Sequence, residues 1–121
     1  MAKNMELSFL FDFYGDMLTD KQRDVIELYY NDDLSLSEIA ENAGITRQGV
    51  RDSIKRAEYQ LLEMEERLGL AKRFRDMQEQ MSHIVNMAQE IRDYNNYLSH
   101  SREIEDCASQ IENAARKLLE E

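Results

Sequence analysis

The 121-residue sequence has no proline, no tryptophan, one cysteine and only four glycines. This scarcity of helix-breaking residues predicts an all-α protein. The single cysteine, Cys107, cannot form an internal disulfide, so we expect a reducing, cytoplasmic location. The sequence also lacks an apolar run long enough to cross a bilayer, and residues 1–18 alternate apolar and acidic side chains, unlike a signal peptide. We therefore expect no membrane insertion.

Patterns of catalytic and metal-binding residues are also lacking. His83 and His100 lie far apart, and neither has a second metal ligand at a suitable spacing. The sequence has no glycine-rich phosphate loop and no nucleophile elbow. The run Asn31-Asp32-Asp33 does not have the alternating ligands of an EF-hand and is typical of a polar loop. We therefore expect no enzyme activity, no metal site and no cofactor.

Residues 35–56, SLSEIAENAGITRQGVRDSIKR, form the most informative stretch. Ser35 and Glu38 have capping-box spacing at the start of a short helix. Gly44 follows where a helix end requires a positive φ, and Thr46 is suited to cap a second helix. The second helix carries a basic outer face. A helix, a glycine turn and a basic helix are the pattern of a helix-turn-helix that binds DNA.

The same stretch belongs to a longer resemblance. Residues 18–62 resemble region 4 of bacterial sigma factors in the segments L-T-x-x-Q-R, S-x-x-E-I-A and G-I-T-R-x-x-V-R. With an aromatic helix ahead and a helical tail behind, the chain resembles the YlxM family of small bacterial proteins. The resemblance implies DNA-binding, transcription regulation and a connection with the signal recognition particle pathway. Nothing in the chain resembles the sigma region that opens promoters, so the resemblance does not imply an initiation factor.

Seven residues of the second helix and its cap are candidates for DNA contacts: Thr46, Arg47, Gln48, Arg51, Asp52, Lys55 and Arg56. The sigma-like pattern implies phosphate and base-edge contacts for the first two, and base contacts for Gln48, Arg51, Asp52 and Lys55. Glutamine pairs with adenine and arginine with guanine, whereas Asp52 can only accept from cytosine or repel phosphate. The alternative is a solvated helix face whose cations pair with Glu58 and other acids.

The net charge of −10 opposes this interpretation, because proteins that bind nucleic acid non-specifically are usually basic. Locally, however, Arg47, Arg51, Lys55 and Arg56 with Asp52 give residues 47–56 at the start of the second helix a charge of +3. Salt limits the reach of more distant acids to about 8–10 Å. The acidity should therefore weaken affinity without excluding a specific site.

The residues before Gly69 are expected to form one domain, 1–69. An apolar stripe in residues 6–18 consists of Leu7, Leu10, Phe11, Tyr14 and Leu18. Phe9 and Phe13 form a second stripe, which either packs in the core or contacts the tail or a second subunit. Thr19 and Gln22 predict a capping box that opens a helix to about Asn31. The helix that begins after Thr46 should end at Gly69.

Residues 70–121 are expected to form a helical tail, packed on the same unit or on a second subunit. A predicted seam with 4-3 spacing consists of Leu70, Phe74, Met77, Met81, Ile84, Ala88, Ile91, Asn95 and Leu98. Ser101 can cap a last helix with a predicted inner face of Ile104, Cys107, Ala108, Ile111, Ala115 and Leu118. Two antiparallel helices would make a hairpin, and a continuous helix with a slipped register is the alternative.

Two functional hypotheses follow. The first is a DNA-binding regulatory protein that reads a specific double-stranded site in the major groove, as a homodimer formed through the first helix and the tail. The second is a protein–protein adaptor of the signal recognition particle pathway that has the same fold and does not read DNA. The basic face of the second helix favours DNA, and the acidic remainder favours a protein partner.

Overall fold

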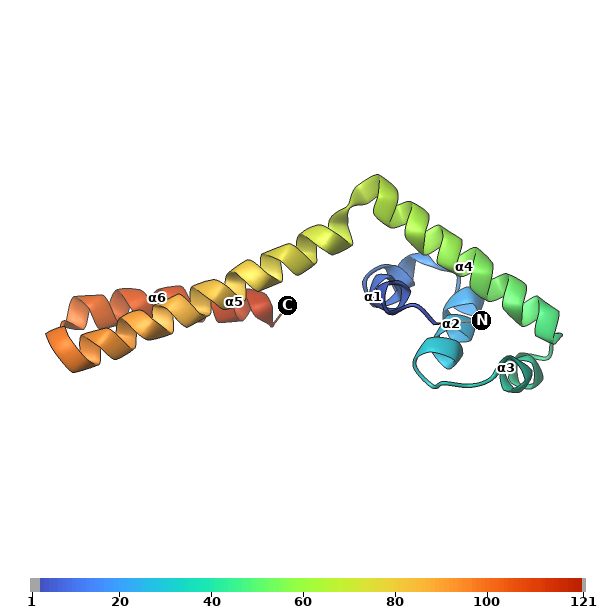
Figure 1. The fold of residues 1–121 in the computed structure, drawn as a ribbon, viewed down its shortest axis with the longest axis horizontal. Helices are drawn as coiled ribbons and strands as arrows, with labels where there is room; N and C mark the ends of the chain where they lie inside the picture. The colour runs from blue at the N-terminus through green and yellow to red at the C-terminus, as the bar shows by residue number, and fades with distance from the viewer. Residues whose placement is uncertain (1–2, 121) are drawn as a thin grey trace. The chain divides into compact units, whose positions relative to one another are not determined.

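The computed structural model describes residues 3–120, and every regular element in that range is helical, which confirms the predicted all-α fold class. The elements are α1 (Met5–Tyr14), η1 (a 3₁₀ turn, Gly15–Met17), α2 (Asp20–Tyr30), α3 (Leu36–Ala43), α4 (Arg47–Leu68), α5 (Leu70–Tyr94), η2 (a π-helical turn, Asn95–Ser99) and α6 (Arg102–Leu119) (Figure 1). The chain divides into two compact units, Met1–Ala71 and Lys72–Glu121, which are described separately.

The first unit has a core to which α1, α2, α3 and α4 all contribute. Its largest fully buried side chains are Leu10, Ile26, Ile39, Val50, Ile54 and Leu61. The whole stripe predicted for residues 6–18 is buried, as its apolar spacing indicated. Phe9 and Phe13 are half-buried and pack against the same core, as the core-packing interpretation of this second stripe expects.

Three predicted helix starts are capped as the sequence indicates. Thr19 and Ser35 each form a complete capping box, with Gln22 and Glu38 respectively. Thr46 accepts a 2.9 Å hydrogen bond from the Gly49 N–H at the start of α4. These bonds satisfy backbone donors that the first turn of a helix leaves without partners.

Two glycines with positive φ end the helices. Gly44 ends α3 with φ +69°, and Gly69 ends α4 with φ +63°. Side chains with a Cβ rarely adopt this left-handed conformation. The prediction that Gly44 makes the turn of the helix-turn-helix is therefore confirmed, as is the end of α4 at Gly69.

Glu65 connects three segments of the first unit. Its Oε1 accepts hydrogen bonds from the Tyr14 hydroxyl at 2.6 Å and from the Ala71 backbone N–H at 3.0 Å. Burial, followed by the hydrogen bond to Glu65, raises the pKa of Tyr14 above its usual value. Tyr14 therefore stays protonated and keeps α1 attached to α4 across the physiological pH range.

The second unit is a hairpin of two antiparallel helices, α5 and α6, rather than a continuous helix (Figure 1). Arg92 donates to Glu105 and to Glu112, both at 2.9 Å, and thereby joins the two helices. At the turn, the Asn95 side chain donates to the Ser101 carbonyl at 2.7 Å and accepts from the Ser101 N–H at 2.9 Å. Asn95 is buried, so these bonds replace the water that its amide would otherwise contact.

The predicted inner face of α6 is wrong in most of its members, and most of the seam predicted for α5 does not face α6. The inner face of the hairpin buries small or polar side chains: Val85, Ala88, Asn95, Ala108, Glu112 and Ala115. Many large members of the predicted faces are exposed instead, including Met77, Ile84, Ile91, Leu98, Ile104, Cys107, Ile111 and Leu118. Leu70 and Phe74 are also more than a third exposed. Small side chains between α5 and α6 allow the two helices to approach closely. The larger side chains then lie outside the contact between the helices.

Candidate nucleic-acid interface

The helix-turn-helix consists of α3, the turn at Gly44 and the first half of α4. Val50, Ile54 and Ala57 lie on one side of α4 and are completely buried. This row fixes the rotation of the helix about its axis, because each member packs in the core of the first unit. The opposite side of α4 must therefore face solvent.

Six of the seven candidate residues are spread over three sides of α4, and the seventh, Thr46, caps its start. Gln48, Asp52 and Lys55 follow each other at spacings of four and three on the side opposite the buried row. Arg47 and Arg51 lie on one flank, and Arg56 lies on the other. All seven are exposed except the half-buried Arg51.

Gln48 and Asp52 are connected on the exposed side of the helix. The Gln48 Nε2 donates to the Asp52 Oδ1 at 3.0 Å, one helical turn away. This bond uses one of the two N–H donors of the amide and leaves the second N–H, the Gln48 carbonyl and the second Asp52 oxygen for other partners. The centre of the face therefore presents more acceptors than donors, while its cations lie around them.

A hollow that no sequence pattern predicted lies beside the first half of α4. Its volume is about 430 Å³, and it lies between the start of α2 and the start of α4, with Thr19, Lys21, Gly49 and Arg56 among its lining residues. Lys21 was not a candidate, because no motif connects the first turn of α2 with α4. The fold alone brings this lysine to the same hollow as Arg56.

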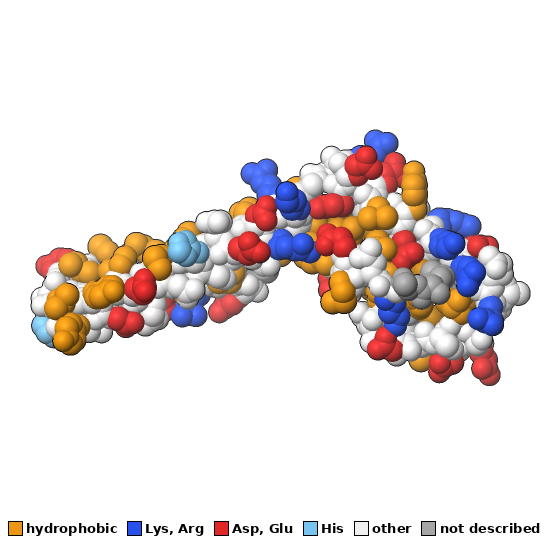
Figure 2. Space-filling model, viewed as in Figure 1, with side chains coloured by type: hydrophobic (Ala, Val, Ile, Leu, Met, Phe, Trp, Pro, Cys, Tyr) orange, Lys and Arg blue, Asp and Glu red, His pale blue; other side chains and the backbone are white. Residues whose placement is uncertain are grey.

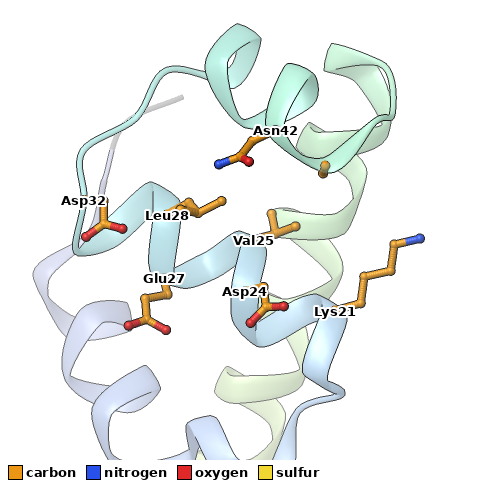
Figure 3. Close-up of a pocket in the computed structure, with 8 residues that line it drawn as sticks. Lys21, Asp24, Val25, Glu27, Leu28, Asp32 and Asn42 are labelled. Atoms are coloured by element: carbon orange, nitrogen blue, oxygen red, sulfur yellow. The ribbon is translucent and has the colours of Figure 1, made fainter.

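An acidic groove of about 430 Å³ lies between α2 and α3. Asp24, Glu27 and Asp32 line it, together with apolar Val25 and Leu28. In Figure 3 the Lys21 amine points away from these carboxylates. A groove of this charge is unsuited to phosphate, whereas the start of α4 carries exposed cations.

The charge on the visible face agrees with this division. In Figure 2, Lys and Arg side chains gather at the end of the first unit where α4 begins, with fewer acidic side chains between them. At the start of α3, the hydrogen bond from the Ser35 N–H lowers the pKa of Glu38 below its usual value. Glu38 therefore remains ionised and keeps α3 capped at neutral pH.

Within residues 3–120, no helix has both the length and the apolar character needed to cross a membrane. The same residues contain no group of three or more His, Cys, Asp or Glu side chains placed to hold a metal ion.

Comparison with known proteins gives a consistent family match. Residues 1–114 match the model of the family UPF0122, described as "Putative helix-turn-helix protein, YlxM / p13 like". A UPF0122 protein of Thermoanaerobacter sp. is 43% identical over 106 residues, which cover 88% of this chain and 91% of the relative. A UPF0122 protein of Desulforamulus reducens is 45% identical over 87 residues, covering 72% of this chain and 74% of the relative. One from Bacillus cereus is 44% identical over 90 residues, covering 74% and 82%.

Proposed function

Because this chain belongs to the UPF0122 family of YlxM/p13-like helix-turn-helix proteins, we propose that it is a regulatory protein that binds a specific double-stranded DNA site. The observation that carries the proposal is the exposed, cation-flanked face of α4 directly after the turn at Gly44. The N-terminal part of the second helix is the part that contacts base edges in this motif. The proposed DNA-binding form is a homodimer in the cytoplasm.

In this proposal the central residues of the α4 face read bases. Gln48 reaches adenine, and Arg51 reaches guanine from its flank. The acceptor pair formed by Gln48 and Asp52 favours bases with an exposed amino group, which are adenine and cytosine in the major groove. The preferred site should therefore include cytosine or adenine opposite this pair.

The surrounding cations hold the phosphate backbone in this proposal. Arg47 and Lys55 lie beside the reading residues, while Arg56 shares its hollow with Lys21. The backbone N–H groups at the start of α4, after Thr46, add the positive end of a helix dipole. Such contacts position the protein and carry no sequence information of their own.

The test is selection of bound genomic fragments, followed by fluorescence anisotropy with the selected and scrambled duplexes. Gln48→Ala should cost about 1–3 kcal/mol on the selected duplex and much less on the scrambled one, because base contacts specify. Gln89→Ala, an exposed glutamine on α5, is the matched control and should change neither affinity. Equal binding of selected and scrambled duplexes at physiological salt would remove this proposal.

The acidic groove between α2 and α3 favours a second candidate function, an adaptor that binds a basic protein segment in the signal recognition particle pathway. Its apolar floor and acidic rim suit such a segment. Purified protein components of that pathway should then bind with an affinity that falls when Asp24→Asn and Glu27→Gln are combined. Unchanged affinity in this double variant would exclude the groove as the binding surface.

A further inference from the structure

In the hairpin of the second unit, small or polar side chains are buried between the helices, and most large apolar side chains are exposed to solvent. Between its helices it buries one valine and three alanines together with Asn95 and Glu112. Nine larger apolar side chains are between 37% and 68% exposed: Met77, Ile84, Met87, Ile91, Tyr94, Leu98, Ile104, Ile111 and Leu118. Two helices gain most of their stability by burying such side chains, so this hairpin is one half of a larger packing arrangement.

The exposed side chains follow a strict seven-residue repeat on both helices. One row consists of Met77, Ile84, Ile91 and Leu98, and the other of Ile104, Ile111 and Leu118. Met87 and Tyr94 extend the first row at intermediate positions. A sustained seven-residue apolar repeat is the pattern by which helices pack along their length against other helices. Scattered exposed apolar residues do not show such spacing.

Both rows lie on the same side of the hairpin. On α5, each member of the row comes one position before a buried or half-buried residue, as Ile84 precedes Val85. Leu98 continues the spacing in η2, beyond the end of α5. The same offset holds on α6, where Ile111 precedes Glu112. Because the two helices run in opposite directions, the same offset turns both rows toward one side. Figure 2 shows hydrophobic side chains gathered along the hairpin.

We infer that this apolar face of the hairpin is covered by the same face of a second copy, forming an antiparallel four-helix bundle. The two rows of apolar side chains on this face can pack against the same two rows of a second copy. A two-fold axis between the copies makes such an interface self-complementary. The inference concerns the second unit alone and does not require that the protein binds DNA.

The charges along the hairpin favour the second copy and fix its direction. At the open end, residues 72–79 contain three cations and two anions, a net +1. Around the turn, residues 90–106 contain two cations and five anions, a net −3. An antiparallel arrangement places the acidic turn of each copy at the basic open end of the other. A parallel arrangement would place the two acidic turns together.

The antiparallel arrangement predicts which residues meet at the two-fold axis. Rotation about an axis across the hairpin places α6 against the partner's α6 and α5 against the partner's α5. Ile111 is at the middle of α6 (Arg102–Leu119), so the two copies of Ile111 should face each other. Cys107 lies one turn nearer to the hairpin turn, away from its own copy.

The first test measures mass by light scattering. The wild-type chain should have twice the 14.3 kDa of one copy at tens of micromolar. Ile84→Glu and Ile111→Glu should each shift the mass toward one copy, because a charge enters the apolar face. Asn86→Glu places the same charge at an exposed position outside that face and should keep the dimer. A monomeric wild type would overturn the inference and leave the face to a different protein.

The second test remains informative if the glutamate variants fail to fold. Ile111→Cys in a Cys107→Ser background should form an intermolecular disulfide on mild oxidation. Asn113→Cys in the same background lies on the other side of α6 and should form almost none. Equal cross-linking of the two variants, or cross-linking of Asn113→Cys alone, would overturn the antiparallel bundle.

Discussion

At Gly44, the backbone conformation alone determines how much a side chain would lower the free energy of unfolding. Its φ is +69°, and a Cβ at this position would have no atom within 4 Å. Gly44→Val should therefore lower the free energy of unfolding by about 1–3 kcal/mol through backbone strain without any clash. Denaturant unfolding measures this loss. Gly44→Asn is the control, because asparagine tolerates the left-handed region better and should lose clearly less. Equal losses in the two variants would assign the cost to a contact rather than to φ.

Single residues with local roles were predictable from the sequence. Thr19, Ser35 and Thr46 cap helices with hydroxyls that bond to backbone groups only three positions away. The conformation of Gly44 is likewise predictable from the residues on either side of it. Lys21 was missed because its place beside Arg56 depends on how α2 packs against α4. That packing is a property of the tertiary structure, and no local spacing encodes it.

At the scale of helices, the sequence predicted the hairpin but not which side chains lie between its two helices. A seven-residue repeat shows that a row of side chains meets another helix, but it does not show which helix. On α6, Cys107 and Ala108 lie in adjacent rows, and only the alanine faces α5. The buried row contains Glu112, which apolar periodicity alone would never place inside. Its burial depends on arginines that come from both helices.

Glu112 makes the hairpin sensitive to acid. Hydrogen bonds from Arg116 at 2.8 Å and Arg92 at 2.9 Å lower the pKa of Glu112 below its usual value. A pKa that is lower in the folded state stabilises the fold above the unfolded value of about 4.3 and loses this effect as pH falls below it. Glu112→Gln should therefore lower the melting temperature at pH 7, and its difference from wild type should shrink below about pH 4.

The measurement is thermal unfolding followed by circular dichroism from pH 7 to pH 3. Glu90→Gln, at an exposed position on α5, is the control and should follow the wild type at every pH. The difference between variant and wild type reports Glu112 together with Arg92, which Glu112 shares with Glu105. A difference that stays constant from pH 7 to pH 3 would mean that the Glu112 charge does not stabilise the hairpin.

For the whole molecule, the net charge of −10 competes with the local cations of α4. If the four cations assigned to the backbone, Arg47, Lys55, Arg56 and Lys21, each neutralise a phosphate, counterion release gives a log–log salt slope of about −3.6 per copy. Affinity per copy should then fall about a hundredfold between 50 and 200 mM salt. The distant acids change the absolute affinity but release no counterions from DNA, so they should leave the slope nearly unchanged.

The slope should respond only to cations that meet the DNA. Lys55→Ala or Arg56→Ala should reduce its magnitude by about one unit per copy and weaken selected and scrambled duplexes alike, because phosphate contacts are independent of sequence. Lys117→Ala removes the same charge from an exposed position on α6, outside the helix-turn-helix, and should leave the slope as it is. Fluorescence anisotropy across a salt series measures all three. If Lys117→Ala flattened the slope as much as Lys55→Ala did, the attraction between protein and DNA would come from overall charge. That result would contradict the proposal that α4 contacts the phosphate backbone.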